Sequence, residues 1–250
     1  MEFVDLDGLV KEHVPQPSCL KNHPLAPQHP FFWAISAPTG GGKTYSLIQL
    51  MLQGLIKFDH LYLFIKDVHE DKWQFLLKFL NTISDSAKSD PLFTVGTKAE
   101  DVPNPDEMEK EGTKLFIFDD FINDKKANNT VVLDLFTRGR KKNCSVVYLT
   151  QSYYALNKTT RINCNYFSLF GVASQNELRT LASEHGAEIG YQKMREYFQT
   201  ALSKPYGFLF IDKKTNDPDL KYRSGFFNHI ESGENLINKF SEEHIDEQEE

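Results

Sequence analysis

The sequence has few cysteines, no long apolar run and no basic leader, and each of these absences excludes a class of protein. Three cysteines, Cys19, Cys144 and Cys164, are too few and too scattered for the disulfide framework of a small secreted domain. No stretch approaches the roughly 20 apolar residues that a membrane-spanning helix needs. The first residues include the acidic Glu2 and Asp5, where a signal peptide has a basic segment. We therefore expect a protein that is neither secreted nor embedded in a membrane.

The 250 residues have the composition of an ordinary globular protein. Hydrophobic residues make up 40% and charged residues 25% of the chain, which is typical of a folded domain of this size. The net charge is −7, and six carboxylates without a Lys or Arg lie in the last ten residues, so the rest of the chain is close to neutral. An acidic total charge therefore does not exclude nucleic-acid binding, which depends on where basic residues cluster.

Proline and charge divide the chain into three regions. Five of the 11 prolines lie in residues 1–30, and because proline lacks an amide donor we expect an extended arm there. Residues 31–230 form the predicted domain. The acidic residues 231–250 are predicted to be a disordered tail.

Within the predicted domain, short apolar runs alternate with stretches of helical periodicity. Runs that are apolar throughout, such as Leu115–Phe118, are typical of strands buried on both faces of a parallel sheet. The alternation predicts right-handed crossovers and a three-layer α/β domain with a mainly parallel central sheet. The predicted strands are Phe32–Ser36, His60–Ile65, Lys114–Asp119, Ser145–Thr150, Tyr166–Val172 and Tyr206–Asp212. The predicted helices are Lys43–Ile56, Asp71–Ser84, Asn128–Arg140, Gln175–His185 and Tyr191–Leu202. The acidic residues 99–111, with two prolines, are expected to be a surface insertion.

The strongest motif lies between the first predicted strand and the first predicted helix. It consists of Ala37, Pro38, Thr39, Gly40, Gly41, Gly42, Lys43 and Thr44, followed by Tyr45. Glycines allow backbone amides to surround phosphate oxygens, and the N-terminus of the following helix adds partial positive charge. Lys43 is expected to reach the β- and γ-phosphates, and the Thr44 hydroxyl to ligate Mg²⁺. Ala37 stands where the pattern has its first glycine. A glycine-rich turn that merely precedes Lys-Thr is disfavoured by the flanking strand and helix.

A buried strand that ends in two carboxylates supports this interpretation. Asp119 and Asp120 directly follow the run Leu115–Phe118. Asp119 is placed to hold Mg²⁺, directly or through water, and Asp120 to orient an attacking water or accept its proton. Acidic residues often follow apolar strands, so without the glycine-rich loop a solvated strand end would be the better interpretation. Together the two motifs indicate nucleoside triphosphate hydrolysis.

Two further polar features each have more than one interpretation. Gln151 follows the predicted strand Ser145–Thr150, where a glutamine could bind the γ-phosphate or its water as a sensor, or be an ordinary loop residue. Arg138 and Arg140 belong to a run of four positive charges in residues 138–142, at a predicted helix end. They could stabilise the helix C-terminus, enter a neighbouring subunit's site as an arginine finger, or contact DNA phosphates.

Taken together, these motifs resemble the genome-packaging ATPases of double-stranded DNA viruses, of poxvirus and virophage type, which are a branch of the FtsK–HerA superfamily. The resemblance covers residues 31–212 and rests on the segments APTGGGKT, LFIFDD, LFTRGRKKN, VVYLTQSYY and RINCNYF. It implies a P-loop NTPase domain of the RecA-like ASCE type that uses ATP and Mg²⁺. Ala37 in place of glycine, and Asp120 where many relatives carry glutamate, depart from the family pattern.

The resemblance also implies roles and partners. It assigns phosphate and Mg²⁺ binding to Lys43 and Thr44, metal binding and catalysis to Asp119 and Asp120, sensing to Gln151, and a trans-acting arginine to Arg138 or Arg140. It implies a homo-oligomeric ring, usually hexameric, that moves duplex DNA into a preformed capsid, with capsid or portal proteins as partners. The expected location is the virion or a cytoplasmic virus factory in the host.

A DNA-translocating ring predicts basic residues in its pore, and other functions remain open. The candidates are Lys125, Lys126, Lys141, Lys142, Lys158, Arg161, Lys213, Lys214, Lys221 and Arg223. A charge run is more often a solvated face. A helicase or another DNA pump would share the core chemistry. A nucleotide kinase would need an Arg-rich lid, and an ABC-type ATPase would need a Leu-Ser-Gly-Gly-like motif; the sequence offers neither.

Overall fold

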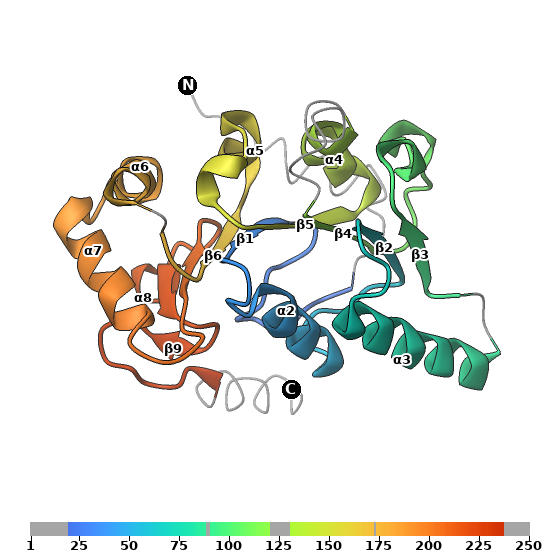
Figure 1. The fold of residues 1–250 in the computed structure, drawn as a ribbon, viewed down its shortest axis with the longest axis horizontal. Coiled ribbons are helices and arrows are strands. Elements are labelled where there is room, and N and C mark those ends of the chain that lie inside the picture. The colour runs from blue at the N-terminus through green and yellow to red at the C-terminus, as the bar shows by residue number, and fades with distance from the viewer. Residues whose placement is uncertain (1–19, 89–90, 121–130, 173, 238–250) are drawn as a thin grey trace, which may run out of the picture.

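The computed structural model describes residues 20–88, 91–120, 131–172 and 174–237. In this part of the chain, nine strands form one sheet (Figure 1). The strand order is β3-β2-β4-β5-β1-β6-β7-β8-β9, and pairing is parallel from β3 to β6 and antiparallel from there on. The strands are β1 (Phe32–Ser36), β2 (His60–Ile65), β3 (Phe93–Gly96), β4 (Lys114–Asp119), β5 (Cys144–Thr150), β6 (Tyr166–Leu169), β7 (Leu209–Asp212), β8 (Tyr222–Ser224) and β9 (Asn228–His229).

Helices cover both faces of the sheet, which gives the three layers that strand–helix alternation predicts. In Figure 1, α2 and α3 lie on one face and α4 and α5 on the other, while α6 and α7 flank the antiparallel end. The helices are α2 (Lys43–Leu52), α3 (Asp71–Ala87), α4 (Val132–Arg138), α5 (Lys158–Asn163), α6 (Gln175–His185), α7 (Gly190–Ala201) and α8 (Pro218–Lys221). In the described part of the chain, no helix is both long and apolar enough to cross a membrane.

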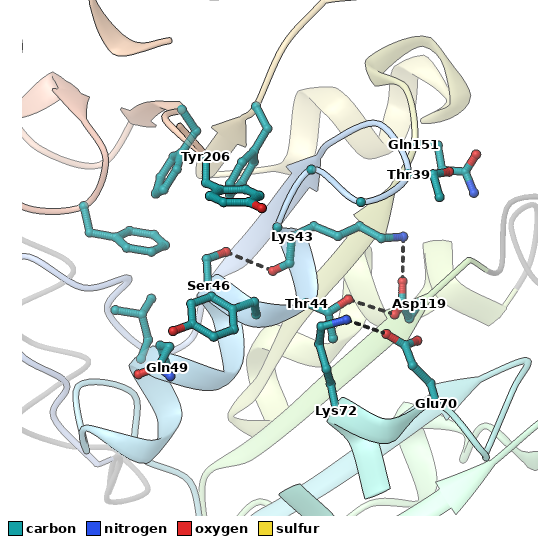
Figure 2. Close-up of a pocket in the computed structure, with 18 of the residues that line it drawn as sticks. Thr39, Lys43, Thr44, Ser46, Gln49, Glu70, Lys72, Asp119, Gln151 and Tyr206 are labelled. Atoms are coloured by element: carbon teal, nitrogen blue, oxygen red, sulfur yellow. Dashed lines mark hydrogen bonds and ion pairs between the residues drawn. The ribbon is translucent and has the colours of Figure 1, made fainter. Parts of the chain in front are cut away.

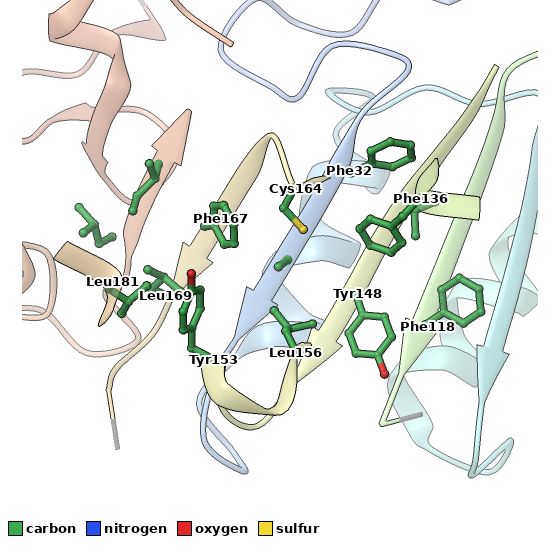
Figure 3. Close-up of a cluster of buried hydrophobic side chains, with 14 of the residues drawn as sticks. Phe32, Phe118, Phe136, Tyr148, Tyr153, Leu156, Cys164, Phe167, Leu169 and Leu181 are labelled. Atoms are coloured by element: carbon green, nitrogen blue, oxygen red, sulfur yellow. The ribbon is translucent and has the colours of Figure 1, made fainter. Parts of the chain in front are cut away.

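Successive residues of the central strands enter two different hydrophobic cores. On β1, Trp33 and Ile35 join the core that includes α2 and α3, whereas Phe32 and Ala34 join the one that includes α4, α6 and α7. Figure 3 shows this second core, in which Phe32 lies against Phe136 of α4 with ring centroids 5.0 Å apart. A strand that is buried on both faces needs apolar side chains at successive positions, which explains the continuous apolar runs in the sequence.

The sheet aligns the carboxyl ends of three strands at one edge. Ser36 of β1 is level with Thr150 of β5, and Asp119 of β4 is level with Leu149. Because β5 lies between β1 and β4, the glycine-rich loop, the carboxylates and the residue after β5 emerge side by side. Ligands of open α/β sheets bind at this edge.

The predicted elements differ from the observed ones mainly at their ends. Helix α2 ends at Leu52 rather than Ile56, because Gly54 adopts a φ of 68° that no helix continues. Strand β6 ends at Leu169 rather than Val172, and β7 begins only at Leu209. Strands β3 and β9 and helices α5 and α8 were not predicted, because each has at most six residues and shows no clear periodicity.

The regions outside the sheet pack closely on the domain. Residues 20–30 lie in no strand, yet Leu25 and Ala26 are buried. Residues 99–111 contain the 3₁₀ turns Ala99–Asp101 and Pro105–Glu107. They dock on the end of α4, where Arg138 pairs with Asp106, and on the basic segment that follows it, where Lys142 donates to the carbonyls of Asp106 and Met108. Of the predicted tail, residues 231–237 are described and 238–250 lie outside the described residues.

Candidate nucleotide-binding site

The glycine-rich loop joins β1 to α2, and its backbone requires glycine at two positions. Gly40 and Gly42 have φ angles of 77° and 98°, in the left-handed region that side chains disfavour. The Gly41 N–H donates to the Pro38 carbonyl at 2.9 Å, and a Cβ on Gly41 would stand 2.9 Å from the same oxygen. The loop therefore turns tightly over the N-terminus of α2, where free amides and the helix dipole favour an anion.

Ala37, where the family pattern has glycine, is buried at the start of this loop. Its N–H donates to the Thr150 carbonyl at 3.0 Å, so the loop begins fixed to β5. A Cβ on Gly41 would stand only 3.1 Å from the Ala37 methyl group. The methyl group therefore fits here because the residue that faces it is a glycine.

Lys43, the first residue of α2, spans the space between the loop and β4. Its Nζ donates to Oδ1 of Asp119 at 2.9 Å and to Oδ1 of Asp120 at 3.0 Å (Figure 2 draws the bond to Asp119). Burial lowers the pKa of Lys43, but attraction to Asp119 and hydrogen bonds to both carboxylates raise it more, so this pKa lies above its ordinary value. The ammonium is therefore charged at every pH near neutrality.

The two carboxylates after β4 have different surroundings. The buried Asp119 has its Oδ2 within 3.5 Å of the Thr44 hydroxyl and accepts a hydrogen bond from Trp73 Nε1 at 3.0 Å. Asp120 has a φ of 55° and a side chain that is 44% exposed, so it points into the pocket rather than into the core. A left-handed residue at a strand end turns the backbone and separates the directions of the two side chains.

Residues at the start of α3 complete this side of the site, and no motif in the sequence indicated them. Glu70 and Lys72 line the pocket, with Lys72 Nζ 3.7 Å from Glu70 Oε1. Burial and repulsion by Asp119 raise the pKa of Glu70 above its ordinary value, although Lys72 and Lys43 oppose this shift. Because β2 lies next to β4, a segment that follows β2 had to emerge beside Asp119, and this is the signal that could have identified it.

Gln151 follows β5 and lies near Thr39 in Figure 2. The segment directly after it is held by Glu177 of α6, a buried carboxylate whose Oε1 accepts from the Tyr153 N–H at 2.8 Å and the Ser152 hydroxyl at 3.1 Å. The backbone after Gln151 is therefore tied to another helix, an arrangement that no motif in the sequence indicated.

A pocket of about 990 Å³ brings most of the predicted residues together. Ala37 and Pro38 are at the base of the loop and do not line it. Arg138 and Arg140 do not line it either, because they precede β5 and so lie at the opposite edge of the sheet from Thr150. The predicted residues that line the pocket are Thr39, Gly40, Gly41, Gly42, Lys43, Thr44, Tyr45, Asp119, Asp120 and Gln151.

The candidate DNA-contacting residues have unequal surroundings. The prediction for Arg223 is wrong: only 1% of its side chain is exposed, and it donates to the carbonyl oxygens of Leu25 and Phe226 inside the domain. Arg161 is bound by Glu184 through two hydrogen bonds. Lys141, Lys158, Lys213 and Lys214 are exposed, but Lys213 donates to the Cys164 carbonyl and Lys214 to the carbonyls of Gln28 and Pro30. Lys125 and Lys126 lie outside the described residues.

Solved structures with a similar fold include packaging enzymes of archaeal viruses. B204, the DNA-packaging ATPase from Sulfolobus Turreted Icosahedral Virus, superposes with a TM-score of 0.51 at 15% identity, covering 73% of this chain and 92% of that one. The genome packaging NTPase B204 from Sulfolobus turreted icosahedral virus 2 in complex with AMPPCP gives 0.52 at 15% identity, covering 75% and 94%. These likenesses confirm the predicted fold class.

Curated relatives come from poxviruses. The "DNA packaging protein OPG160" of Vaccinia virus (strain Copenhagen) is 25% identical over 181 residues, 70% of this chain and 66% of the relative. The protein of the same name from Variola virus is 24% identical over 159 residues, 61% of this chain and 58% of the relative. The chain thus spans 66% and 58% of the length of these two relatives, in both cases less than two thirds. The family model described as "Poxvirus A32 protein" matches residues 22–196, most of the chain, so this chain belongs to the Poxvirus A32 protein family.

Proposed function

We propose that this chain is an ATP-hydrolysing motor that translocates double-stranded viral DNA into a preformed capsid. The observation that carries the proposal is the convergence of Lys43, Thr44, Asp119 and Asp120 at the mouth of a glycine-rich loop. The names of the similar proteins, a DNA packaging protein and two genome-packaging NTPases, support the same function.

The donor set fits a triphosphate with Mg²⁺. The loop offers amides and a cation for phosphate oxygens, and the Thr44 hydroxyl and Asp119 carboxylate offer hard oxygen ligands only 3.5 Å apart. Mg²⁺ is commonly held by one or two protein oxygens together with substrate phosphates, as this pair would allow. When bound, the ion would neutralise phosphate charge and orient the β- and γ-phosphates.

The chain's own groups supply the rest of the hydrolytic chemistry. Lys43 would exchange its carboxylate partners for phosphate oxygens, leaving Asp120 to orient the attacking water and take its proton. Gln151, which lines the same pocket, would bind the γ-phosphate or that water. Arg138 or Arg140 would act on the site of a neighbouring subunit, since both lie away from their own pocket.

Translocation requires further partners. We infer a homo-oligomeric ring, hexameric by its resemblance to FtsK–HerA motors, around duplex DNA, with capsid or portal proteins as docking partners, in the virion or a cytoplasmic virus factory. Of the exposed lysines, Lys213 and Lys214 already hold backbone carbonyls, so Lys141 and Lys158 are the described residues that we assign to DNA phosphates. A plot of the logarithm of duplex affinity against the logarithm of salt concentration should become less steep by about 0.9 for each phosphate contact that is lost. An unchanged slope in both Lys141→Gln and Lys158→Gln would contradict their assignment.

Steady-state ATP hydrolysis with and without linear duplex DNA tests the proposed function. We expect DNA to raise the rate, and Lys43→Ala and Asp120→Asn to abolish it, while Lys78→Ala and Asp85→Asn on the exposed face of α3 leave it unchanged. Wild-type activity no higher than that of Lys43→Ala would overturn the ATPase. Strand separation would instead indicate a helicase, and phosphate transfer to a small acceptor without DNA a kinase.

A further inference from the structure

The pocket has a second half, on the other side of the loop, which no phosphate-binding or metal-binding role explains. Its walls are the aromatic residues Phe170, Tyr206, Phe208, Phe226 and Phe227. They come from the end of β6 and from the segments around β7 and β8, which are far from the carboxylates of β4 in the strand order.

This aromatic half lies against the loop itself. A Cβ on Gly42 would stand 3.4 Å from Cδ1 of Tyr206 and 3.7 Å from Cε1 of Phe170. Asp119 ends β4 and Gln151 follows β5, both on one side of β1 in the strand order. Phe170 follows β6 and Tyr206 precedes β7, on the other side of β1. A triphosphate with its terminal phosphate toward Asp119 would therefore direct its nucleoside end toward the aromatic side.

The rings of the aromatic wall pack against one another, and one ring on it is open to solvent. Phe170 stacks on Phe208 with centroids 4.4 Å apart, and Phe208 meets Phe226 at 4.7 Å; all three are buried. Tyr206, in contrast, is 74% exposed and has a φ of 57°. Figure 2 shows its ring above the start of α2.

The backbone turn at Tyr206 depends on the next residue, Gly207. A Cβ on Gly207 would lie 2.2 Å from the Ala201 carbonyl oxygen, so only glycine allows the chain to pass this close to the end of α7. The Gly207 N–H also donates to the Lys204 carbonyl at 2.9 Å. The turn fixes the backbone of Tyr206 beside the loop, so stacking on the ring costs only the freedom of its own two side-chain torsions.

The polar groups of this half of the pocket are neutral. Gln49 and Gln53 of α2 line it, and their amides carry both donors and acceptors. We propose that this half binds the nucleobase of the substrate, with a purine stacked on Tyr206 and its edge facing Gln49 and Gln53. This inference rests on the proposed function and adds a subsite to it. A purine has a larger face to stack than a pyrimidine, so purines should be favoured. Stacking and rotatable amides accept either purine, so we expect little preference between ATP and GTP.

Calorimetric titration of two ligands, ATP and inorganic tripolyphosphate, separates the base subsite from the phosphate loop. In Tyr206→Ala we expect ATP affinity to fall about tenfold, the range of a lost base–aromatic stack, and tripolyphosphate affinity to stay within about twofold. Tyr206→Phe should bind ATP as the wild type does. Tyr191→Ala, which removes a tyrosine from α7 outside this pocket, is the matched control. CTP should lose less affinity than ATP in Tyr206→Ala.

The outcomes distinguish this subsite from the function on which it rests. If Lys43→Ala weakens both ligands but Tyr206→Ala leaves ATP affinity unchanged, the base subsite is wrong and the phosphate loop stands. Equal losses of ATP and tripolyphosphate in Tyr206→Ala would also overturn it, because the ring would then act only through Gly42. A wild-type protein that binds neither ligand would overturn the proposed function together with the subsite.

Discussion

The indole Nε1–H of Trp73 donates a hydrogen bond of 3.0 Å to Oδ2 of Asp119 and so joins the first turn of α3 to the end of β4. This oxygen is also the one that lies within 3.5 Å of the Thr44 hydroxyl. Trp73 is fully buried and occupies none of the pocket surface. Its contact therefore orients the carboxylate without reaching a ligand, as groups behind metal ligands commonly do.

Trp73→Phe should raise the Mg²⁺ concentration needed for half-maximal hydrolysis about tenfold, because Asp119 loses a donor that fixes its orientation. The measurement is hydrolysis rate against Mg²⁺ at saturating ATP. Trp33→Phe is a matched control, since Trp33 is an equally buried indole whose Nε1 bonds to Ser168 instead. Equal shifts in the two variants would mean that packing, and not the hydrogen bond to Asp119, is responsible.

The hydrogen bonds of Glu177 predict a role in positioning Gln151. Glu177→Ala should lower kcat about tenfold, the value of a lost hydrogen bond to a charged group, and leave ATP affinity nearly unchanged. Glu177→Gln, which keeps an acceptor for the Tyr153 N–H, should recover most of the loss. Glu188→Gln, near the end of α6, is the control because Glu188 pairs only with Lys221 at the surface in the described part of the chain. A fall in ATP affinity equal to the fall in kcat would argue against positioning.

The sequence predicted the central strands, and it predicted that the glycine-rich loop and the carboxylates at the end of β4 would lie together, as they do in one pocket. The physical reasons are local. The strands Phe32–Ser36 and Lys114–Asp119 were predicted with their observed bounds, because burial on both faces leaves a continuous apolar run in the middle of each. The loop is identified by its glycines, which its backbone angles require.

The remaining features depend on contacts between distant segments. Trp73 reaches Asp119 across 46 positions of the chain, and Glu177 reaches Tyr153 across 24, so no spacing rule connects them. The aromatic wall is assembled from Phe170, Phe208 and Phe226, which only the antiparallel addition of β7 and β8 brings together. The burial of Arg223 follows from the same addition, and in the sequence it looked like an ordinary surface charge.

The position of the basic segment before β5 predicts catalysis between subunits. Arg138 is held by Asp134 at 2.8 Å and also pairs with Asp106, which favours a structural role for it. We therefore expect Arg140→Ala to lower hydrolysis at least about a hundredfold, as loss of an arginine finger does. Mixing it with Lys43→Ala should restore activity, since some interfaces then combine an intact loop with an intact arginine. A mixture no more active than its components would contradict action in trans, and Lys141→Ala mixed with Lys43→Ala serves as the control for assembly.

Acidification should destabilise the protein through His185, which lies under the segment that follows Gln151. Its Nε2 is 2.7 Å from the Tyr153 hydroxyl, and no described group bonds to its Nδ1. Burial, with a further contribution from Lys213, lowers the pKa of His185 to about 4, whereas an unfolded histidine has a pKa of about 6.5. The unfolded chain therefore binds a proton first as the pH falls.

The resulting change in stability has a defined direction and range. The free energy of unfolding is unaffected by His185 above about pH 6.5, where the histidine is neutral in both states. As the pH falls from there toward 4, protonation of the unfolded chain lowers this free energy by about 3 kcal/mol in all. Burial also lowers the pKa of His29 to about 4, so the two histidines should contribute comparably. Urea unfolding between pH 4 and 7 measures this. His185→Gln should remove about half of the slope, while His69→Gln, at an exposed position, should keep it. A slope that is the same in all three proteins would show that carboxylates, and not buried histidines, set the acid sensitivity.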